Sequence, residues 1–248
     1  MKSLFPGSYP PTDAEFKTLW SDGLFVFDAN MLLSFFRLSE KASNDFLDLL
    51  KTPEVAHRVW IPHQAAIEYH RNLDDVRNEP IAKCRDIVAK IKNWSDSSRA
   101  DDHRRRGKEL WDIAQRFLKE AEDHYRHPDR NALIMQIAEF FDGKIGDEWD
   151  EKKLAESYKE GEKRYSREIP PGFKDRGKKG EDKYGDLVVW NQIIEHAKAQ
   201  KKPIIFITDD DKEDWWLKID GKTIGPLPAL RTEMHKKAGV LFYMYSGD

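Results

Sequence analysis

A chain of 248 residues with one cysteine and a net charge of −3 excludes several classes of protein. It is long enough to bury a core without disulfides, and a lone Cys84 excludes an internal disulfide and any zinc site made of several cysteines. No apolar run approaches the roughly 18 residues that span a membrane, and residues 1–11 lack the layout of a signal peptide. We expect a cytoplasmic protein without a membrane segment, in which Cys84 is a buried, small apolar residue.

Two short apolar segments in the first part of the chain predict strands. Leu24–Phe27 ends directly at Asp28, and a further apolar segment follows. Val59–Ile61 is ended by a proline, and the residues after it, which include Glu68, suit a helix. Each predicted strand is therefore followed by an acidic side chain.

A long block from about residue 74 to residue 167 contains no convincing strand. Its apolar residues recur at helical spacing in three groups. These groups are Ile81, Cys84, Val88 and Ile91; Leu110, Ala114, Phe117 and Ala121; and Leu133, Ile137, Phe140 and Phe141. We interpret the block as a helical insertion within a single domain that covers residues 1–248.

The last third of the chain begins with a basic loop rich in Gly and Lys, at 170–185. Its segment 174–183 holds five basic and three acidic residues. A helix is predicted from Asp186, where the helix dipole favours a carboxylate. The apolar face of this helix comprises Leu187, Trp190, Ile193 or Ile194, and Ala197.

Two more strands are predicted near the C-terminus. Ile204–Ile207 is followed by Thr208 and three aspartates, and Val240–Ser246 is the last apolar run. The chain ends two residues after this run. We therefore expect that the chain could be part of a longer natural protein.

This order of strands and helices predicts a parallel α/β sheet, in which sites form at the carboxyl ends of the strands. Asp28 and the group Asp209–Asp211 follow predicted strands, while Glu68 and Asp186 lie on helices that begin near the same edge. Four acidic positions that are distant in sequence are therefore expected to meet. Scattered carboxylates suit Mg²⁺ or Mn²⁺, and a cation among them would explain why three adjacent aspartates follow a buried strand.

Each acidic residue also has a simpler interpretation. Asp28 and Asp186 could be helix N-caps, and Glu68 could be a surface or salt-bridged residue. The group Asp209–Asp211 could be a solvated turn. Spacing alone leaves these alternatives open.

Four segments, in the right order, resemble the motifs of PIN-domain nucleases. They are "FVFDANMLL", "IPHQAAIEYH", "KYGDLVVWNQII" and "IIFITDDDKEDWW". The longer stretch from Pro170 to Trp216 is similar to a bacterial PIN-like subfamily with a long helical insertion between the second and third acidic motifs. The resemblance implies a three-layer α/β fold with a central, mostly parallel sheet.

The resemblance further implies a metal-dependent endonuclease that hydrolyses phosphodiester bonds in RNA or DNA with one or two Mg²⁺ or Mn²⁺ ions. Residues that match the motifs fall into two groups. The catalytic metal ligands would be Asp28, Glu68, Asp186 and Asp210, with Asp209 as a further metal ligand; Asn30, Thr208 and Asp211 would orient water or these carboxylates. The resemblance also suggests a homodimer and a role as a toxin or phage-defence effector, and a nuclease needs a regulatory or inhibitory partner.

The basic loop before Asp186 has two interpretations. It could grip substrate phosphates beside the metal, or it could be a mobile solvated loop. The candidate nucleic-acid-binding residues are Lys174, Arg176, Lys178, Lys179 and Lys183. Trp215 and Trp216 are expected to pack under the sheet edge rather than to stack on bases.

Two rival functions belong to other classes. A PIN domain could bind nucleic acid or serve as a scaffold without cutting, but the presence of all four acids counts against this alternative. A phosphatase with an aspartate nucleophile is the second rival. The segment "DANML" lacks the paired aspartates expected of haloacid-dehalogenase-like phosphatases.

Overall fold

The structure is a computed structural model that describes residues 1, 5–97, 99–125 and 129–247. The chain divides into two compact units, Met1–His70 with Phe141–Asp248, and Arg71–Phe140. We call the first the sheet unit and the second the helical unit. Helix α8 of the block interpreted as an insertion falls in the sheet unit. The assignment of a single domain with an insertion at 74–167 stays a prediction.

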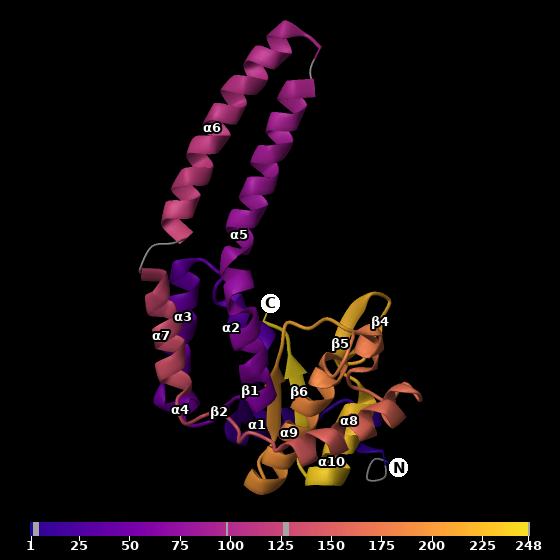
Figure 1. The fold of residues 1–248 in the computed structure, drawn as a ribbon. Helices are drawn as coiled ribbons and strands as arrows, with labels where there is room; N and C mark the ends of the chain where they lie inside the picture. Colours follow the sequence, from indigo (N-terminus) through magenta and orange to yellow (C-terminus); the bar gives the residue numbers. More distant parts are fainter. Residues whose placement is uncertain (2–4, 98, 126–128, 248) are drawn as a thin grey trace. The chain divides into compact units, whose positions relative to one another are not determined.

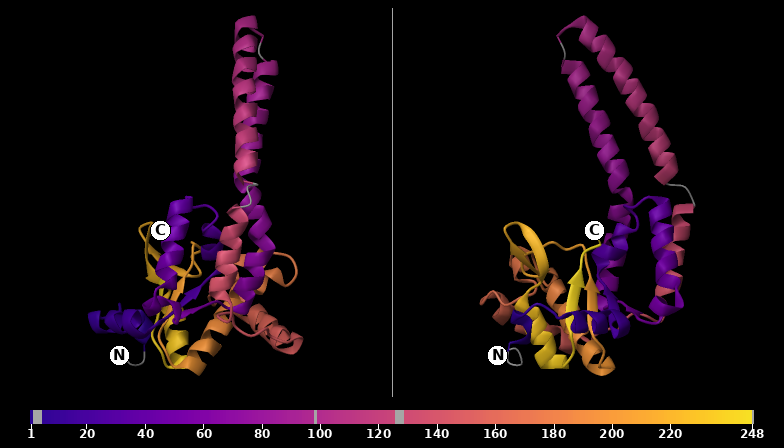
Figure 2. Two further views of the ribbon diagram at one scale, coloured as in Figure 1. Left: turned by 90° about the vertical axis from the view of Figure 1, so that its left-hand side faces the viewer. Right: turned by 180° about the vertical axis from the view of Figure 1, so that it is seen from behind.

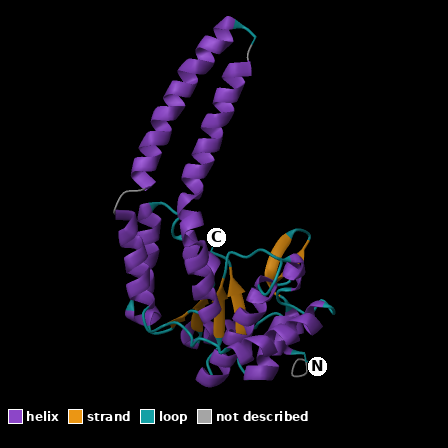
Figure 3. Ribbon diagram, in the orientation of Figure 1, coloured by secondary structure: helices purple, strands orange, loops and turns teal. Residues whose placement is uncertain are grey.

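A parallel sheet of four strands forms the centre of the sheet unit (Figures 1 and 3). The strand order is β2 (Val59–Trp60), β1 (Leu24–Phe27), β3 (Ile204–Ile207) and β6 (Phe242–Tyr245). The predicted strands are confirmed, although the second and the last are shorter than expected. Ile61 forms only an isolated bridge, to Ile145. Both central strands are almost wholly buried, as expected of strands covered on both faces.

Helices α1 (Asp13–Asp22) and α3 (Glu40–Lys51) cover one face of this sheet. Phe16 and Trp20 of α1 pack on Tyr243 and Tyr245 of β6, with ring centroids 5.0 and 5.3 Å apart. On the same face, Phe46 of α3 lies against β1. The short helices between these elements are α2 (Ala29–Ser34) and α4 (Pro53–Ala56), and a 3₁₀ turn, η1 (Pro6–Ser8), precedes α1.

Helix α9 (Gly185–Gln200) covers the opposite face, where Trp190 packs on Phe242 with ring centroids 5.0 Å apart. The helix begins where predicted, but it is buried on more than the one predicted face, since Val188 and Val189 are also buried. Helices α8 (Glu151–Tyr165) and α10 (Pro228–Ala238) pack against it and supply this burial.

A buried ion pair connects α8 to α10. The guanidinium of Arg164 binds both carboxylate oxygens of Glu233, with Nη1–Oε1 at 2.6 Å and Nη2–Oε2 at 2.7 Å. The indole of Trp190 donates to the same carboxylate at 3.0 Å. Only 6% of Arg164 is exposed, so its charge depends on its acidic partners, which are Glu233 and, at 3.2 Å, Glu160.

A two-stranded antiparallel hairpin adds to the predicted elements. It consists of β4 (Trp216–Ile219) and β5 (Lys222–Pro226), joined by Asp220 and Gly221. These two residues have φ values of 50° and 75°. An Asp-Gly pair with positive φ at both positions is typical of a tight hairpin turn, so the sequence carried a signal for this element.

Three helices build the helical unit. Helix α5 (His63–Ser97) starts in the sheet unit, and α6 (Asp101–Tyr125) and α7 (Asp129–Phe141) follow it. Figures 1 and 2 show α5 and α6 side by side as an antiparallel hairpin. None of the helices in the described part of the chain is long and apolar enough to cross a membrane.

The predicted helical spacing is confirmed, but it does not bury every residue that follows it. Leu110 and Phe117 of α6 leave 47% and 63% of their surfaces exposed. Gly107 of α6 is buried instead. It lies on a neighbouring side of the helix. Cys84 is half-buried rather than buried, because it flanks the contact formed by Ile81 and Val88 instead of lying within it.

Candidate active site

Polar side chains from two neighbouring strands meet where these strands end. Asp28 follows β1 and Thr208 follows β3, and the Thr208 hydroxyl donates to Asp28 Oδ2 at 2.7 Å. Asp28 Oδ1 accepts a hydrogen bond from the amide of Ala29 at 2.8 Å, so Asp28 is also the N-cap of α2. Asn30 Nδ2 lies 3.4 Å from Asp28 Oδ2. The N-cap alternative for Asp28 is therefore confirmed, and the same side chain still faces the strand ends.

Glu68 and Asp186 approach this carboxylate from two helices. Glu68 lies near the start of α5, where Gln64 Nε2 donates to its Oε1 at 2.8 Å. A Cβ atom on Gly185 would lie only 2.6 Å from Glu68 Oε1, so a glycine at the start of α9 permits this approach. The charges of Glu68 and Asp186 both raise the pKa of Asp28. Asp186 is the second residue of α9 and is not its N-cap.

The ammonium group of Lys212 lies among the remaining acidic residues. Its Nζ is 2.8 Å from Asp186 Oδ2, 2.8 Å from Asp210 Oδ2 and 2.9 Å from Asp175 Oδ2. The ammonium group of Lys212 therefore contacts three carboxylates, and Asp175 also pairs with Lys178 at 2.7 Å. Sequence reasoning missed both Lys212 and Asp175, because each lies in a charged loop that could equally be solvated. The structure shows a local contact between two residues of this loop, in which the Asp210 side chain accepts a hydrogen bond from the Lys212 amide at 2.8 Å.

Burial and crowding change the protonation of these acids. Desolvation raises the pKa of Asp28 to about 7, and it raises that of Asp186 to about 6 even though Lys212 opposes the shift. Burial also acts on Asp175, but its ion pairs with Lys178 and Lys212 outweigh this and lower its pKa. Burial at the end of β1 and at the start of α9 therefore disfavours the ionised forms of Asp28 and Asp186.

The other two aspartates of the group after β3 point elsewhere. Asp209 is exposed, and its Oδ1 accepts from the amide of Gly247, just beyond β6, at 2.9 Å. Asp211 is also exposed. The structure therefore brings Asp28 together with Glu68 and Asp186, and Asp186 together with Asp210. The assignment of individual metal ligands stays a prediction.

Two tryptophans line the buried side of this group, as expected from the sequence. Only 2% of Trp215 and 4% of Trp216 are exposed. Trp215 Nε1 lies 3.4 Å from Asp186 Oδ2, and Trp216 Nε1 donates to the carbonyl of Asp210. Both rings pack under the strand ends and so are not available to stack on bases.

The basic loop folds beside the acidic residues as two 3₁₀ turns, η2 (Phe173–Gly177) and η3 (Asp182–Tyr184). Three of its predicted phosphate-binding residues form ion pairs. These pairs are Lys174 with Glu213 at 2.8 Å, Arg176 with Glu168 at 3.0 Å and Lys178 with Asp175 at 2.7 Å. The Nζ of Lys183 lies 4.8 Å from the ring centroid of Tyr184. Lys179 is exposed.

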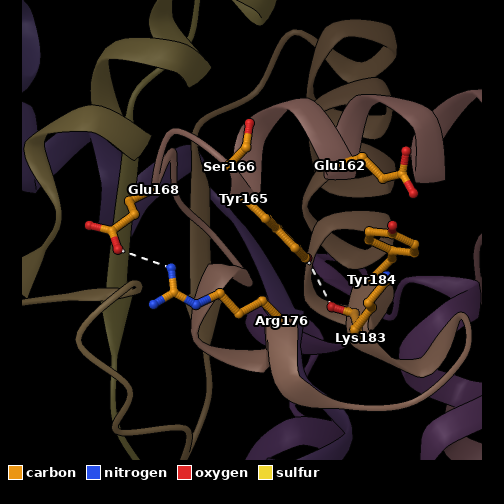
Figure 4. A pocket seen from close by; sticks show the side chains of 7 residues that line it. All are labelled: Glu162, Tyr165, Ser166, Glu168, Arg176, Lys183 and Tyr184. Carbon is orange, nitrogen blue, oxygen red and sulfur yellow. Dashed lines mark hydrogen bonds and ion pairs between the residues drawn. The ribbon is translucent and has the colours of Figure 1, made fainter.

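A pocket of about 380 Å³ opens between this loop and the end of α8 (Figure 4). Tyr165 crosses it and donates its hydroxyl to the carbonyl of Lys183 at 3.0 Å. A Cβ atom on Gly172 would contact both the Tyr165 hydroxyl and Asp186 Cβ, so the pocket lies next to the acidic residues. Its lining consists of Glu162, Tyr165, Ser166, Glu168, Arg176, Lys183 and Tyr184.

The donors in this site fit Mg²⁺ or Mn²⁺ chemically. Within the described residues, no three histidine, cysteine, aspartate or glutamate side chains converge closely enough to hold a metal ion. All donors are nevertheless carboxylate oxygens, which these hard cations prefer. Burial raises the pKa values of Asp28 and Asp186, so a nearby positive charge would favour their ionised forms, and an ammonium group already lies between Asp186 and Asp210. A metal ion bound by these two carboxylates would compete with Lys212.

Comparison with models of known families gives a match over most of the chain. A family model described as "PIN like domain" matches residues 24–230, which include all four predicted catalytic carboxylates. No curated protein matches the chain, and no solved structure does so either.

Proposed function

The chain belongs to the family of PIN-like domains, whose superfamily consists generally of nucleases, and from this membership we propose that it is a metal-dependent endonuclease acting on RNA or DNA. The observation that carries the proposal is the group of carboxylates at the carboxyl edge of a parallel sheet. Asp28, Glu68 and Asp186 are close enough for their charges to interact. Such a group is costly without a cation, and stability alone gives no reason to keep it.

Four side chains of this chain would hold the cation in the proposed mechanism. Asp28, Glu68, Asp186 and Asp210 supply carboxylate oxygens, and the exposed Asp209 is an additional candidate. A bound Mg²⁺ or Mn²⁺ lowers the pKa of its water and stabilises the charge that develops during hydrolysis of a phosphodiester. Thr208 holds Asp28 Oδ2 by its hydrogen bond, and Asn30 lies on the same oxygen.

Lys212 has a definite role in this proposal. In the absence of a divalent ion, its ammonium group neutralises Asp186 and Asp210 and so keeps the carboxylates from repelling one another. Metal binding must displace it from these oxygens. Lys212→Met should therefore increase the affinity for Mn²⁺ about tenfold and lower the stability of the metal-free protein.

The basic loop would bind substrate phosphates in exchange for its present partners. The pairs of Lys174 with Glu213 and of Arg176 with Glu168 are both well exposed. Exposed ion pairs contribute only about 0–1 kcal/mol, so a polyanion can replace the acidic partner. Lys179 and Lys183 would extend the same contact surface, and Lys178 would do so after leaving Asp175. An inhibitory partner and a role as a toxin or phage-defence effector remain part of the proposal on family grounds alone.

A cleavage assay tests the proposal. Labelled single-stranded RNA, tRNA, single-stranded DNA and duplex DNA are incubated with the protein and Mn²⁺, Mg²⁺ or EDTA. We expect metal-dependent cutting of at least one polymer, reduced more than about 100-fold by Asp28→Ala and by Asp186→Ala. Asp147→Asn, an exposed acid of the sheet unit, is the control and should cut like the wild type.

A calorimetric titration with Mn²⁺ separates the enzyme from its main rival. Wild-type protein that binds RNA or DNA but neither cuts it nor binds Mn²⁺ would be a silent binding or scaffold domain. Loss of Mn²⁺ binding in Asp28→Ala together with loss of cutting would locate the metal at the proposed carboxylates.

A further inference from the structure

The hairpin of α5 and α6 has apolar residues on two of its sides. One side is the seam between the two helices. Val88 and Ser95 of α5 are buried there, and a Cβ atom on Gly107 of α6 would lie only 2.5 Å from Ser95 Oγ. Lys92 Nζ lies 5.7 Å from the ring centroid of Trp111 across the same seam. These contacts identify the sides by which the two helices face each other.

The second side is exposed, although it is built from large apolar side chains. We call it the apolar face. It consists of Ile87, Trp94, Leu110, Ile113 and Phe117, whose surfaces are 57%, 52%, 47%, 55% and 63% exposed.

Helical geometry places these residues on one side of the hairpin. At roughly 100° per residue, Ile87 and Trp94 lie about 110° round α5 from Val88. Ile113 and Phe117 are displaced round α6 from its seam by a similar angle and in the same rotational sense. Because the two helices are antiparallel, both displacements lead to the same side. The contacts Arg85–Glu122 and Lys92–Trp111 show which residues of α5 lie opposite which residues of α6 along the hairpin.

With the two helices aligned in this way, the apolar face is continuous. Ile87 stands beside Phe117, and Trp94 stands beside Leu110, with Ile113 between them. The five side chains expose roughly 600 Å² together, taking about 150–250 Å² for each large side chain. Patches of this size on a monomer are usually interaction sites. A stable interface needs about 800 Å² from each partner, and the rim of the face supplies the remainder.

We infer that the apolar face binds the same face of a second copy of this chain and forms a four-helix bundle. In this dimer a two-fold axis runs parallel to the helices, and α5 of each copy lies on α6 of the other. Residues that lie side by side within one hairpin then also lie opposite each other between the copies. The apolar faces of the two copies are therefore in contact. Four-helix bundles bury such stripes between antiparallel neighbours.

The charges on the rim support a second copy as the occupant. Lys83 and Lys90 flank the face on α5, while Glu109 and Glu120 flank it on α6. The two-fold arrangement sets Lys83 of one copy at the level of Glu120 of the other. Lys83 forms an ion pair with Glu79, one turn away on the same helix, at 2.6 Å, and 71% of its side chain is exposed. A lipid surface would instead favour a rim that is basic throughout. The inference concerns the helical unit alone and does not rest on the nuclease proposal.

Sedimentation velocity of the full-length protein, from about 1 to 100 μM, tests the inference. We expect a reversible dimer whose dissociation constant increases at least 100-fold in the double variant Ile113→Lys with Phe117→Lys. The matched control is Leu49→Lys, at a 54% exposed apolar residue of α3 in the sheet unit. It should leave the dissociation constant unchanged within about twofold. A wild type that stays monomeric at 100 μM, or a dimer that survives the double variant, overturns the inference.

A charge exchange tests the arrangement without adding charge to the apolar face. Lys83→Glu should weaken the dimer about tenfold, and the combination of Lys83→Glu with Glu120→Lys should restore it to within about threefold. Both side chains are exposed, so this test remains decisive even if the double lysine variant does not fold. Equal weakening in the single and the combined variant contradicts the arrangement. A monomeric wild type that binds RNA or anionic vesicles through the apolar face assigns this face to another occupant.

Discussion

The sheet unit and the helical unit both place side chains where stability alone would not, but they do so in opposite ways. In the sheet unit, acidic side chains crowd together at the strand ends, and the raised pKa values of Asp28 and Asp186 show that their charges are unfavourable there. In the helical unit, Ile113 and Phe117 leave more than half of their surfaces exposed. Departures from local rules concentrate at functional sites. Both groups are therefore the places where we propose binding, and substitutions there should affect stability differently from substitutions in the core.

The largest expected change in the free energy of unfolding comes from Arg164, a buried charge that stabilises the fold. Arg164→Met would leave the half-buried carboxylate of Glu233 without its bidentate partner, and only Lys237 and Trp190 among its described partners would still contact it. Breaking a buried pair in this way costs about 3–5 kcal/mol. Urea unfolding measures this cost, with Lys153→Met as the control at the exposed pair with Glu195, where about 0–1 kcal/mol is expected. Equal costs at the two positions would show that burial of the pair contributes nothing.

The same pair predicts how stability changes in acid. Burial opposes the charge of Glu233, but Arg164 outweighs it and lowers the pKa from 4.5 to about 2. Because the folded state holds this proton more weakly, the stabilisation is present above about pH 4.5 and is lost as the pH falls towards 2. It amounts to at most about 3 kcal/mol. Urea unfolding between pH 5 and pH 2 should show a shallower slope in Glu233→Gln, and an unchanged slope would contradict the assignment.

Much of the sheet unit could be predicted from its sequence, because its apolar runs stop abruptly at polar residues. Leu24–Phe27 and Ile204–Ile207 are strands as expected. The sheet order could not be predicted, since it depends on pairing between distant segments. The β4–β5 hairpin was missed although Asp220 and Gly221 signal its turn.

The approach of Asp28, Glu68 and Asp186 to one another could be predicted because Asp28 follows a strand and the other two lie in the first turns of helices. Lys212 and Asp175 could not, because their roles depend on how two charged loops turn in space. In α6, Leu110 and Phe117 follow helical spacing just as well as the seam residues do. Periodicity shows that a side of a helix is apolar but does not show whether that side meets its own chain.

At the acidic site we expect a smaller change in the free energy of unfolding. Its sign is opposite, because the substitution there should stabilise the protein whereas Arg164→Met destabilises it. The pKa of Asp28 rises from 3.8 to about 7, so the folded state holds this proton more tightly than the unfolded state does. Wild-type stability without metal should therefore fall as the pH rises from about 4 to about 7. Asp28→Asn removes this slope.

In EDTA near pH 8, Asp28→Asn should be more stable than the wild type by about 1–3 kcal/mol, after allowance for solvent screening. Thermal unfolding checks the prediction, and excess Mn²⁺ should stabilise only the wild type. A variant that is less stable than the wild type in EDTA would show that Asp28 serves folding through its N-cap bond, and the contrast with Arg164 would be lost.

The smallest effect is expected on the apolar face. Ile113→Ala removes a side chain that is 55% exposed, and Ile81→Ala removes the same atoms from a position that is 4% exposed in the same unit. The buried change should cost about 2–5 kcal/mol. The exposed one should stay within about 0.5 kcal/mol, because alanine is also the better helix former. Urea unfolding is measured at a protein concentration below the dissociation constant of the dimer, so that association does not contribute. If Ile113→Ala costs as much as Ile81→Ala, Ile113 belongs to the core of the helical unit, and the apolar face is no longer available to a second copy.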